Sequence, residues 1–539
     1  MAPTKLFNIF LLIAAIALLI NVGSYGVTES SDARYAEISR KMFVSGDYMH
    51  PDLLDVHHYH KPPLTYQITA LGYSIFGINT FGARFFLQIA ILIQLILVFQ
   101  LSKLLFNNEK TALWASIIYF SFPLVLISSR NLTTDAFLAT FELLTVYCWV
   151  VYRKKGAIKW LYFFTISLAL GFLTKGPVVF IVPLIFILFF NTSERAKHNI
   201  NIHHLLAWLL FIAIAGSWFF YLVAENSIFL DYFLGRQTAE RFSENVFGRT
   251  EPFWYFLVFS PLVGLPWFFV LLYLLKINKR LIKYRSTYLI LLMSCVIPLI
   301  FFSISSSKRI LYILPIYSTL SILTAQLFSL TGENKLKPVK FIIIGFILLI
   351  STVFVAAPFI EKIDLNLPIS IAILGLLLIL TTFIIFRKTV LSGKSKLVAL
   401  TLITTVVLLI TSSHVFSNNE LKVNATKPIT DFIKQQKLSD RNILVYNTRK
   451  SSIAFGLNKS IISLNNGHES LARETQFETS ENWKKYLVDL KNDDEVNYLK
   501  QLLEQPTVLI SNKKLTSNTE WILNHYKNKK EMGKWTIYY

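Results

Sequence analysis

The sequence is 539 residues long, 54% of its side chains are hydrophobic, 15% are aromatic, and its mean hydropathy is +0.51. This composition excludes an ordinary soluble globular protein and makes lipid the expected solvent. The net charge of +21 would fit a nucleic-acid-binding protein only if the basic residues gathered on one soluble face. The two cysteines, Cys148 and Cys295, fall inside apolar runs, so neither a disulfide framework nor a thiolate metal site is expected.

Apolar runs long enough to cross a hydrocarbon core of about 30 Å recur through the first four fifths of the sequence, and we count about thirteen. The first run has no small-residue cleavage site after it, so it is predicted to be an uncleaved span. The predicted spans are residues 6–20, 81–101, 111–129, 135–152, 160–173, 177–190, 204–224, 254–275, 287–304, 310–330, 341–360, 367–386 and 397–414.

The loops between these spans fall into two alternating sets that differ in charge. One set holds twenty basic residues and only three acidic ones, which accounts for most of the net charge. Because Lys/Arg-rich loops are retained on the cytoplasmic side, this set and the N-terminus are predicted to lie inside. Topology therefore explains the basic balance, and nucleic acid is not an expected partner. The opposite, outer set holds the segments with unusual polar residues, at 23–80, 130–134, 174–176, 225–253, 305–309 and 361–366.

The last part of the chain, residues 415–539, turns polar. Short strand-like runs at Asn442–Tyr446, Thr507–Ile510 and Trp535–Tyr539 alternate with charged helical stretches such as Ser480–Leu503. The predicted fold class is an all-α polytopic membrane protein with a small C-terminal α/β extracytoplasmic domain. We expect a transmembrane domain over 1–414, whose first outer loop at about 23–80 contains interfacial helices, and a soluble domain over 415–539.

The first outer loop begins with a helical pattern in which Ala33, Ala36, Met42 and Phe43 alternate with charged residues. One interpretation is an amphipathic helix that anchors the loop at the membrane surface. An anchor gains nothing from acidic residues, however, and here they stand beside basic ones. These four charged residues are Asp32, Arg34, Glu37 and Arg40.

The same loop continues to a histidine-rich segment that ends in Lys61-Pro62-Pro63. Histidine is a common metal ligand, but in an extended stretch His58 and His60 should point to opposite sides, which makes a zinc site from His57, His58 and His60 a weak prediction. The two prolines keep the chain extended and fix Lys61 just above the next apolar segment. A lysine held there suits a lipid phosphate.

The next two outer segments carry Asp135 and Lys175. Asp135 follows two threonines, so one alternative is that Thr133, Thr134 or Asp135 only caps the following helix. Lys175 precedes Gly-Pro at the end of an apolar run, where a lysine can simply extend its ammonium group to water. The irregular Gly-Pro backbone is tolerated only beside protein or water, and this favours a functional role.

Two later outer segments add further cations. The loop 231–252 contains Arg241, and an aromatic cluster at Pro252–Tyr255 is typical of an interfacial belt. Lys308, Arg309 and Tyr312 follow in a tight outer turn. Basic residues on the outer side oppose the expected charge bias, so they are expected to have an anionic partner, for which phosphate is the obvious candidate.

Cations that neutralise a phosphate leaving group, beside carboxylates that can accept a proton, fit sugar transfer from a lipid-linked donor. The alternative is a lipid-linked sugar transporter or flippase, which could bind the same phosphate. A flippase should carry polar groups through both halves of the bilayer, whereas the charges here lie at the outer ends of the predicted spans.

Taken together, these motifs resemble the GT-C glycosyltransferases of the protein O-mannosyltransferase superfamily, and most closely the bacterial lipid A aminoarabinose (4-amino-4-deoxy-L-arabinose) transferases. The motifs that carry the resemblance are Arg34–Arg40 with Ser45-Gly-Asp47, Lys61-Pro62, Thr174–Gly176, Arg241-Phe242, Pro252–Tyr255, and Lys308 with Tyr312–Leu314. The resemblance implies thirteen spans, a periplasmic active site, a polyprenyl-phosphate sugar donor and inversion at the anomeric carbon.

The resemblance also implies roles for individual residues. Lys61, Arg241 and Tyr312 would hold the carrier phosphate, and Asp135 would support the site. The donor-phosphate set is expected to include Lys175, Lys308, Arg309 and Arg34 as well, and the catalytic set to be Asp32, Asp135 and Glu37. The expected partners are the polyprenyl-phosphate sugar, a lipid, glycan or protein acceptor, and membrane lipids. The expected location is the bacterial cytoplasmic membrane, with the active site and C-terminal domain on the periplasmic side.

Two departures from the family pattern affect these roles. The family usually has Asp-Glu where this chain has Ser31-Asp32, so Asp32 or the upstream Glu29 must act as the base, and Asp32 is the expected one. Just before Lys61, where the family usually has an acidic residue, this chain has His60. The family also has a Glu-His-x-x-Arg-Phe stretch, and its histidine is replaced here by Thr238. No cofactor is predicted; a divalent metal, with His60 as its weak candidate ligand, is left open.

Overall fold

The computed structural model describes residues 2–194, 200–233, 235, 251–284, 286–388, 391–468 and 470–539. These residues form two compact units. Unit 1 contains Met1–Ile20 and Leu87–Ser412, and unit 2 contains Asn21–Phe86 and Ser413–Tyr539. The first outer loop and the polar C-terminal segment, which are far apart in the sequence, therefore belong to the same compact body.

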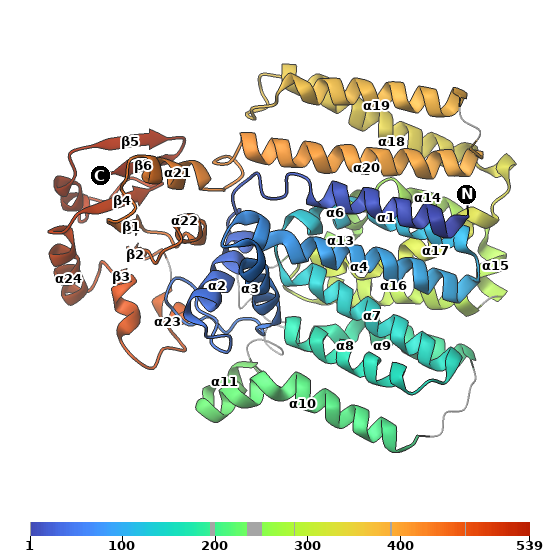
Figure 1. The fold of residues 1–539 in the computed structure, drawn as a ribbon, viewed down its shortest axis with the longest axis horizontal. Coiled ribbons are helices and arrows are strands. Elements are labelled where there is room, and N and C mark those ends of the chain that lie inside the picture. Colours follow the sequence, from blue (N-terminus) through green and yellow to red (C-terminus); the bar gives the residue numbers. More distant parts are fainter. Residues whose placement is uncertain are drawn as a thin grey trace. The chain divides into compact units, whose positions relative to one another are not determined.

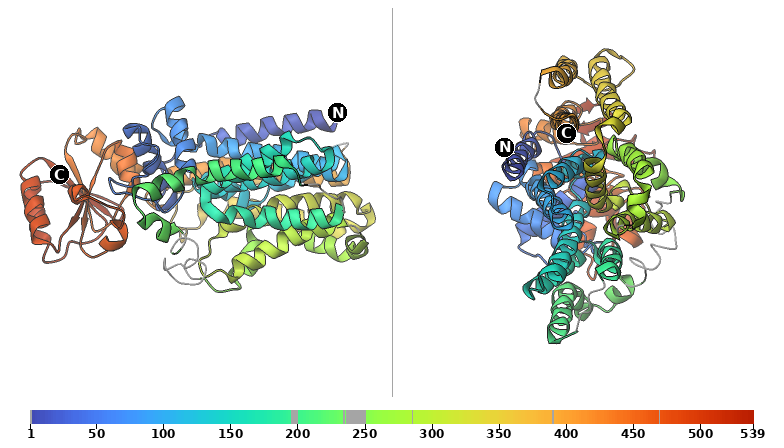
Figure 2. Two further views of the ribbon diagram at one scale, coloured as in Figure 1. Left: turned by 90° about the horizontal axis from the view of Figure 1, so that it is seen from below. Right: turned by 90° about the vertical axis from the view of Figure 1, so that its right-hand side faces the viewer.

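Unit 1 is built almost entirely of helices, and its long helices run side by side (Figures 1 and 2). Its elements, with two helices that continue into unit 2, are α1 (Pro3–Leu19), α4 (Thr80–Phe106), α5 (Glu109–Phe120), α6 (Pro123–Arg130), α7 (Thr134–Lys155), α8 (Lys159–Lys175), η1 (Gly176–Phe180), α9 (Ile181–Glu194), α10 (Ile202–Glu225), α11 (Ile228–Asp231), α13 (Tyr255–Val263), α14 (Trp267–Ile277), α15 (Lys279–Tyr284), α16 (Ser286–Ile304), η3 (Ile310–Ile313), α17 (Ile316–Leu330), η4 (Glu333–Lys335), α18 (Lys337–Ala356), η5 (Ala357–Phe359), α19 (Ile369–Lys388) and α20 (Gly393–Asn418).

Two short helices form the centre of unit 1. Nearly every residue of α5 and α17 is buried, and the two helices pack against each other. By contrast, the apolar windows of α18 and α19 are only 22% and 28% buried inside the protein. Large apolar side chains exposed in this way need a lipid environment, which is the behaviour expected of a polytopic membrane protein.

Among the described residues, eight helices are long and apolar enough to cross a membrane, or up to ten if two bent pairs each count as one span. The predicted count of thirteen differs at three places. Two predicted spans correspond to the shorter apolar helices α1 and α17, and two others merge into the continuous helical stretch Lys159–Thr192. A straight 34-residue helix would measure about 51 Å, well over the hydrocarbon thickness. Gly176, at φ +76°, and η1 interrupt it near the middle, so the thirteen-span count stays a prediction.

Unit 2 combines two helices of the first outer loop with an α/β fold. Its elements are α2 (Ser31–Ser45), α3 (Leu64–Phe76), α21 (Lys427–Gln435), β1 (Asn442–Tyr446), α22 (Ser451–Leu457), β2 (Ile462–Asn465), α23 (Leu471–Glu474), η6 (Asn482–Lys485), β3 (Leu487–Asp489), α24 (Asp493–Leu503), β4 (Thr507–Ser511), η7 (Glu520–His525), β5 (Lys529–Met532) and β6 (Trp535–Tyr538). The predicted α/β fold of the C-terminal segment is confirmed.

The sheet of unit 2 has the strand order β3-β2-β1-β4-β6-β5 (Figure 1). The first four strands in this order are parallel, with Leu444 of β1 opposite Ile462 and Leu509. Strand β6 is antiparallel to both of its neighbours, β4 and β5. Helix α24 contributes leucines to the hydrophobic core on one side of this sheet. The three strands predicted from the sequence correspond to β1, β4 and β6.

The prediction of a single helical stretch over Ser480–Leu503 is wrong in its first half. Leu487 and Val488 belong to β3, which pairs with β2 and is buried. Pairing with a neighbouring strand outweighs the charged local sequence, because a three-residue strand is stabilised by its partner rather than by its own pattern. The helix itself begins only at Asp493, where Asn492 caps it by accepting the N–H groups of Asp494 and Glu495.

The helix predicted in the first outer loop is confirmed as α2, but the alternative of a membrane-surface anchor does not fit its environment. Its apolar residues Ala33, Ala36 and Met42 are buried, and its polar residues Asp32, Glu37 and Arg40 are buried too. Helix α2 packs against α3 on one side and α22 on another. A surface anchor would keep a polar face in water; α2 has its polar face inside unit 2.

Candidate functional site

The carboxylate of Asp32 lies in a fully buried ion pair with Arg84, a residue that no motif had singled out. Arg84 Nη2 lies 2.5 Å from Asp32 Oδ2, and the two side chains are 0% and 1% exposed. Asp32 Oδ2 also accepts the backbone N–H of Thr28 at 2.9 Å. Arg84, which is distant in the sequence, therefore supplies a buried positive charge beside Asp32.

Arg84 is itself held by several groups of the chain before α2. It donates to the carbonyl oxygens of Val22, Tyr25 and Gly26 at 2.9–3.1 Å, and its guanidinium lies 4.1 Å from the centre of the Tyr25 ring. A buried guanidinium with this many acceptors fixes the start of the first outer loop against α4. The sequence does carry a signal for it, because an arginine at the beginning of a predicted span is rare without a structural or functional reason.

The second acidic candidate of α2, Glu37, forms a two-point pair with Arg40. Arg40 Nη2 and Nε lie 2.6 and 2.7 Å from the two oxygens of Glu37, and the side chains are 3% and 0% exposed. Burial raises the pKa of the Glu37 carboxyl, and the hydrogen bonds from Arg40 oppose that shift. Both oxygens of Glu37, a predicted catalytic residue, are thus bonded to Arg40 within α2.

Glu29, the alternative base, is half-buried just before α2. Its Oε1 accepts the backbone N–H of Ser452 at 2.8 Å. Burial raises the pKa of the Glu29 carboxyl, although that hydrogen bond and the charges of Lys450 and Arg34 act in the opposite direction. A carboxylate with a raised pKa is a stronger proton acceptor than one tied to a guanidinium.

Lys61 lies three residues before the first residue of α3 and is half-buried, and both prolines that follow it are buried. The predicted position above an apolar segment therefore agrees with the structure. The expectation that His58 and His60 point to opposite sides is wrong, since their ring centres are only 4.3 Å apart and the rings are nearly perpendicular. The segment bends here instead of following the alternation of a strand.

The structure gives no support to a metal site at the histidines. No group of three or more His, Cys, Asp or Glu side chains within the described ranges is arranged to hold a metal ion. Burial, followed by the charge of His60, lowers the pKa of His58 well below its ordinary value. His60 therefore stays a weak candidate ligand, because the described residues contain no group of three possible metal ligands that includes it.

In unit 1, three predicted residues meet at the ends of α7, α8 and η3. Lys175 Nζ lies 2.5 Å from Asp135 Oδ1, and the same ammonium group lies 4.3 Å from the centre of the Tyr312 ring. Thr133, not Asp135, caps α7, because its side chain accepts the backbone N–H of Asp135. The alternative that a residue at 133–135 caps the helix is confirmed for Thr133, while the carboxylate of Asp135 pairs with Lys175.

A buried carboxylate deeper in α7 was missed by the sequence reasoning. Glu142 is 2% exposed, lies seven residues after Asp135, and interacts electrostatically with Lys175 and Asp135. Its Oε2 atom is buried and has no hydrogen-bond partner among the residues that the structure describes. The sequence did contain a signal for Glu142, because an acidic residue inside a predicted span is by default a candidate for function.

Lys308 and Arg309 lie in the turn before η3. Lys308 is 5% exposed and donates from Nζ to the carbonyl oxygen of Glu251 at 2.7 Å, so its partner in the structure is a backbone oxygen. Arg309 is half-buried and accepts the N–H of Tyr312 through its carbonyl. Arg241 lies outside the described residues.

Comparison with known proteins supports the resemblance inferred from the motifs. Residues 60–220 match the family described as dolichyl-phosphate-mannose-protein mannosyltransferase. The chain is 30% identical over 302 residues to an undecaprenyl phosphate-α-4-amino-4-deoxy-L-arabinose arabinosyl transferase 2 from Proteus mirabilis, covering 55% of each chain. It is also 30% identical over 352 residues to the enzyme of the same name from Sodalis glossinidius, covering 64% of each.

The chain thus aligns with only about half to two thirds of the length of these curated relatives. Its fold, however, is shared over nearly the whole length of a solved structure. The crystal structure of ArnT from Cupriavidus metallidurans bound to undecaprenyl phosphate superposes with a TM-score of 0.80 at 19% identity, covering 99% of this chain and 98% of that one. The apo structure of the same protein gives 0.79 at 18% identity.

At this level of identity the structural likeness establishes the fold, and it confirms the predicted class of polytopic helical membrane protein with a small C-terminal sheet domain. The chain is thus similar in part of its sequence to the dolichyl-phosphate-mannose-protein mannosyltransferase family and to the aminoarabinose transferases, and it shares the fold of the solved ArnT protein.

Proposed function

We propose that this protein is a membrane glycosyltransferase that moves a sugar from a polyprenyl-phosphate donor to an acceptor at the outer face of the membrane, with inversion. The observation that carries it is the cluster of Lys175, Asp135 and Tyr312, which holds an ammonium group, a carboxylate and a phenol together. A lysine oriented in this way can stabilise the charge that develops on a departing phosphate. The names of the relatives point to the same donor class, an undecaprenyl-phosphate-linked sugar.

In the proposed reaction an acceptor oxygen forms a bond to the anomeric carbon while the bond from that carbon to the phosphate oxygen breaks. The bonding electrons leave with polyprenyl phosphate, whose charge Lys61, Lys175, Tyr312 and Arg241 would neutralise. If the acceptor is a hydroxyl, its proton must go to a carboxylate. Asp32 is tied to Arg84, so the geometry favours Glu29 as the acceptor of this proton. No step is derived through a metal.

We further propose that the protein lies in a bacterial cytoplasmic membrane, with unit 2 and the candidate site on the periplasmic side. The support is the alternation of basic and polar loops along the sequence. The acceptor class, for which a lipid A-like phosphate, a glycan hydroxyl and a protein side chain are the options, is left to experiment. None of the relatives compared above is named as a transporter, and no contact in the described residues favours a flippase.

The direct test uses the purified full chain in lipid nanodiscs with polyprenyl-phosphate-linked pentoses and hexoses and an extract of acceptor lipids. Release of polyprenyl phosphate that depends on both donor and acceptor is the expected result. Lys175→Ala should slow the release at least about tenfold, because one preorganised cation contributes a few kcal/mol to transition-state stabilisation. Wild-type protein that binds the donor but releases no polyprenyl phosphate with any acceptor fraction would refute the proposed activity.

A further inference from the structure

A short hairpin lies in the first outer loop, a few residues before Lys61. Asp52 and His57 form an antiparallel bridge, and Leu53 and Val56 exchange backbone hydrogen bonds of 2.8 and 3.3 Å. The two residues at its tip, Leu54 and Asp55, both have positive φ, at +54° and +60°. Two consecutive positive φ values are the geometry of a type I′ turn, which favours Gly and Asn. A leucine held in this conformation requires support from the surrounding structure.

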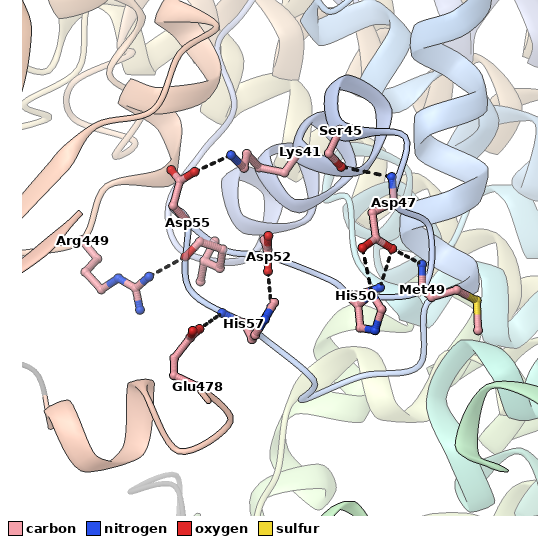
Figure 3. Close-up of polar contacts among 11 residues, drawn as sticks. Lys41, Ser45, Asp47, Met49, His50, Asp52, Asp55, His57, Arg449 and Glu478 are labelled. Carbon is pink, nitrogen blue, oxygen red and sulfur yellow. Dashed lines mark hydrogen bonds and ion pairs between the residues drawn. The ribbon is translucent and has the colours of Figure 1, made fainter. Parts of the chain in front are cut away.

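That support comes from the C-terminal part of unit 2 (Figure 3). Arg449 donates from Nη2 to the carbonyl oxygen of Leu53 at 2.5 Å. Its Nη1 lies 2.5 Å from Glu474. Glu478 accepts the backbone N–H of His57 at 2.6 Å. We call Arg449, Glu474 and Glu478 the clasp. The side chains of Arg449 and Glu474 are 8% and 15% exposed, so this pair is shielded from the screening that weakens surface ion pairs.

Two more contacts secure the hairpin from its own side. Asp52 Oδ1 lies 2.6 Å from His57 Nδ1, and Lys41 of α2 lies 2.5 Å from Asp55 (Figure 3). The tip of the hairpin is therefore bonded to α2, and its two strands are bonded to Arg449 and Glu478. The Asp52–His57 contact joins the two strands to each other. Contacts of this kind at three separate points fix position as well as conformation, because a single bond would leave the hairpin free to pivot.

The hairpin is connected to Lys61 by a short segment that is itself packed. Tyr59 and His60 place their rings 5.3 and 6.1 Å from the ring of Phe477, next to Glu478 in the sequence. His58 is buried as well. A shift of residues 52–57 therefore has to move Lys61, because only three residues separate them and those residues are held by neighbours of the clasp.

We propose that the clasp positions Lys61 for the donor phosphate, so that the C-terminal α/β part of unit 2 sets how tightly the lipid-linked sugar is bound. Arg449 and Glu478 contact the loop backbone, and Glu474 pairs with Arg449. None of the three is proposed to touch the reacting atoms, which makes them positioning residues. This inference deepens the proposed function and rests on it. The strength with which a lysine ammonium binds a phosphate depends on the distance between the two charges, because ion-pair energy falls with separation and with access of water.

The test compares Glu478→Ala with two controls in the full chain in nanodiscs. Glu478→Gln keeps an oxygen that can accept the His57 N–H, and Glu481→Ala removes an exposed glutamate from the same segment, 82% exposed and paired with Lys484. Loss of ground-state phosphate binding raises KM and leaves kcat nearly unchanged. We expect Glu478→Ala to raise KM for the donor about 5- to 20-fold with kcat within about twofold of wild type. The Glu478→Gln and Glu481→Ala variants should keep the wild-type KM.

A second pair of variants and a second measurement keep a folding defect distinct from a positioning defect. Arg449→Met should raise KM in the same way, whereas Arg441→Met, which changes the residue before β1 at the opposite end of that strand, should not. Hydrogen–deuterium exchange should increase over residues 52–61 in Glu478→Ala and Arg449→Met, with β1 and β4 exchanging as in wild type. Increased exchange through the whole sheet would mean general destabilisation and would overturn the inference.

The proposed function and the positioning role of the clasp would be refuted by different results. If wild-type protein neither binds polyprenyl phosphate nor releases it from a donor, the proposed function fails, while the exchange data still report whether the clasp holds the loop. If wild-type protein is active and Glu478→Ala and Arg449→Met keep the wild-type KM, the positioning role is wrong and the proposed function stands.

Discussion

The guanidinium of Arg84 and the carboxylate of Asp32 lie 2.5 Å apart and are 0% and 1% exposed. They join the start of α4 to the first turn of α2, over 50 residues earlier in the chain. Both residues belong to unit 2, where the pair links the helix of the first outer loop to the first residues of α4. Its burial means that removing either charge leaves the other one buried and without this ion-pair partner.

Replacing one member of this pair should therefore destabilise unit 2. Arg84→Met leaves the Asp32 carboxylate buried and uncompensated, and we expect a loss of about 3–5 kcal/mol in the free energy of unfolding. Asp32→Asn should cost a similar amount, and combining the two changes should cost less than their sum by at least about 1 kcal/mol. Denaturant unfolding of the four proteins in detergent measures this coupling, and strictly additive losses would show that the pair is not the unit of stabilisation.

The contact of Lys175 with Tyr312 separates two roles of the tyrosine. Tyr312→Phe keeps the ring that Lys175 lies over but removes the hydroxyl proposed to bind the phosphate. We expect about a tenfold weaker binding of polyprenyl phosphate, as for loss of one hydrogen bond to a charged group, with unchanged thermal stability. Tyr312→Leu also removes the cation–π contact and should lower both binding and stability. Equal binding by Tyr312→Phe and wild type would remove the hydroxyl from the site.

The local pattern of the sequence predicted those parts of the fold that depend on it. The apolar runs, strands β1, β4 and β6, and the helix at Ser31–Ser45 all carry a period or a run that can be read from neighbouring residues. What it did not predict depends on partners distant in the chain. The association of residues 21–86 with 413–539 in one unit, and the burial of β3 beside β2, are set by tertiary packing.

The same distinction applies to the candidate site. Asp135, Lys175 and Tyr312 were each selected for their chemical type at a predicted span end, and the structure brings these three together. The pairing of Asp32 with Arg84 was not predicted, because the two residues are 52 positions apart in the chain. Arg84 and the clasp residues Arg449, Glu474 and Glu478 could not be found this way, since their importance lies in contacts that span up to several hundred residues.

Glu29 and Asp32 should behave differently when their charge is removed. Glu29→Gln keeps an oxygen for the Ser452 N–H but lacks a proton acceptor, so we expect turnover with a hydroxyl acceptor to fall at least about a hundredfold with little change in stability. An acceptor that is already ionised, such as a phosphate, needs no base and should be affected less. Turnover that survives Glu29→Gln with every acceptor would exclude this residue as the base.

The orientation of the membrane part can be tested with single cysteines. Both native cysteines are buried, so a cysteine at an exposed loop position should be the main site of labelling by an impermeant maleimide. Lys362→Cys, in a predicted outer loop, should react in intact cells with a permeabilised outer membrane. Lys155→Cys, at the exposed end of α7, should react only after the inner membrane is opened. The reverse pattern would invert the predicted topology.

The hairpin at residues 52–57 should be held less firmly as the pH rises. The hydrogen bond to Asp52 raises the pKa of the His57 imidazole, burial opposes the shift, and the charges of Asp52, Glu478 and Asp47 add to it. The bond thus favours protonated His57, and its stabilisation is complete below the ordinary histidine pKa of about 6.5. It is lost as the pH rises through the higher pKa of the folded state. In exchange experiments corrected for the chemical rate, protection of residues 52–57 should decline as the pH rises above the ordinary histidine pKa of about 6.5.

The His57→Gln variant supplies the comparison for that pH dependence. A glutamine cannot take up a proton, so protection of residues 52–57 in this variant should be lower than wild type at about pH 6 and should change little with pH. His525→Gln, in η7 on the far part of the sheet domain, should follow the wild-type profile. If the hairpin loses protection with pH equally in wild type and His57→Gln, the titrating group is not His57. In that case the contacts of Arg449 and Glu478, rather than the Asp52–His57 pair, carry the whole attachment of the loop that presents Lys61.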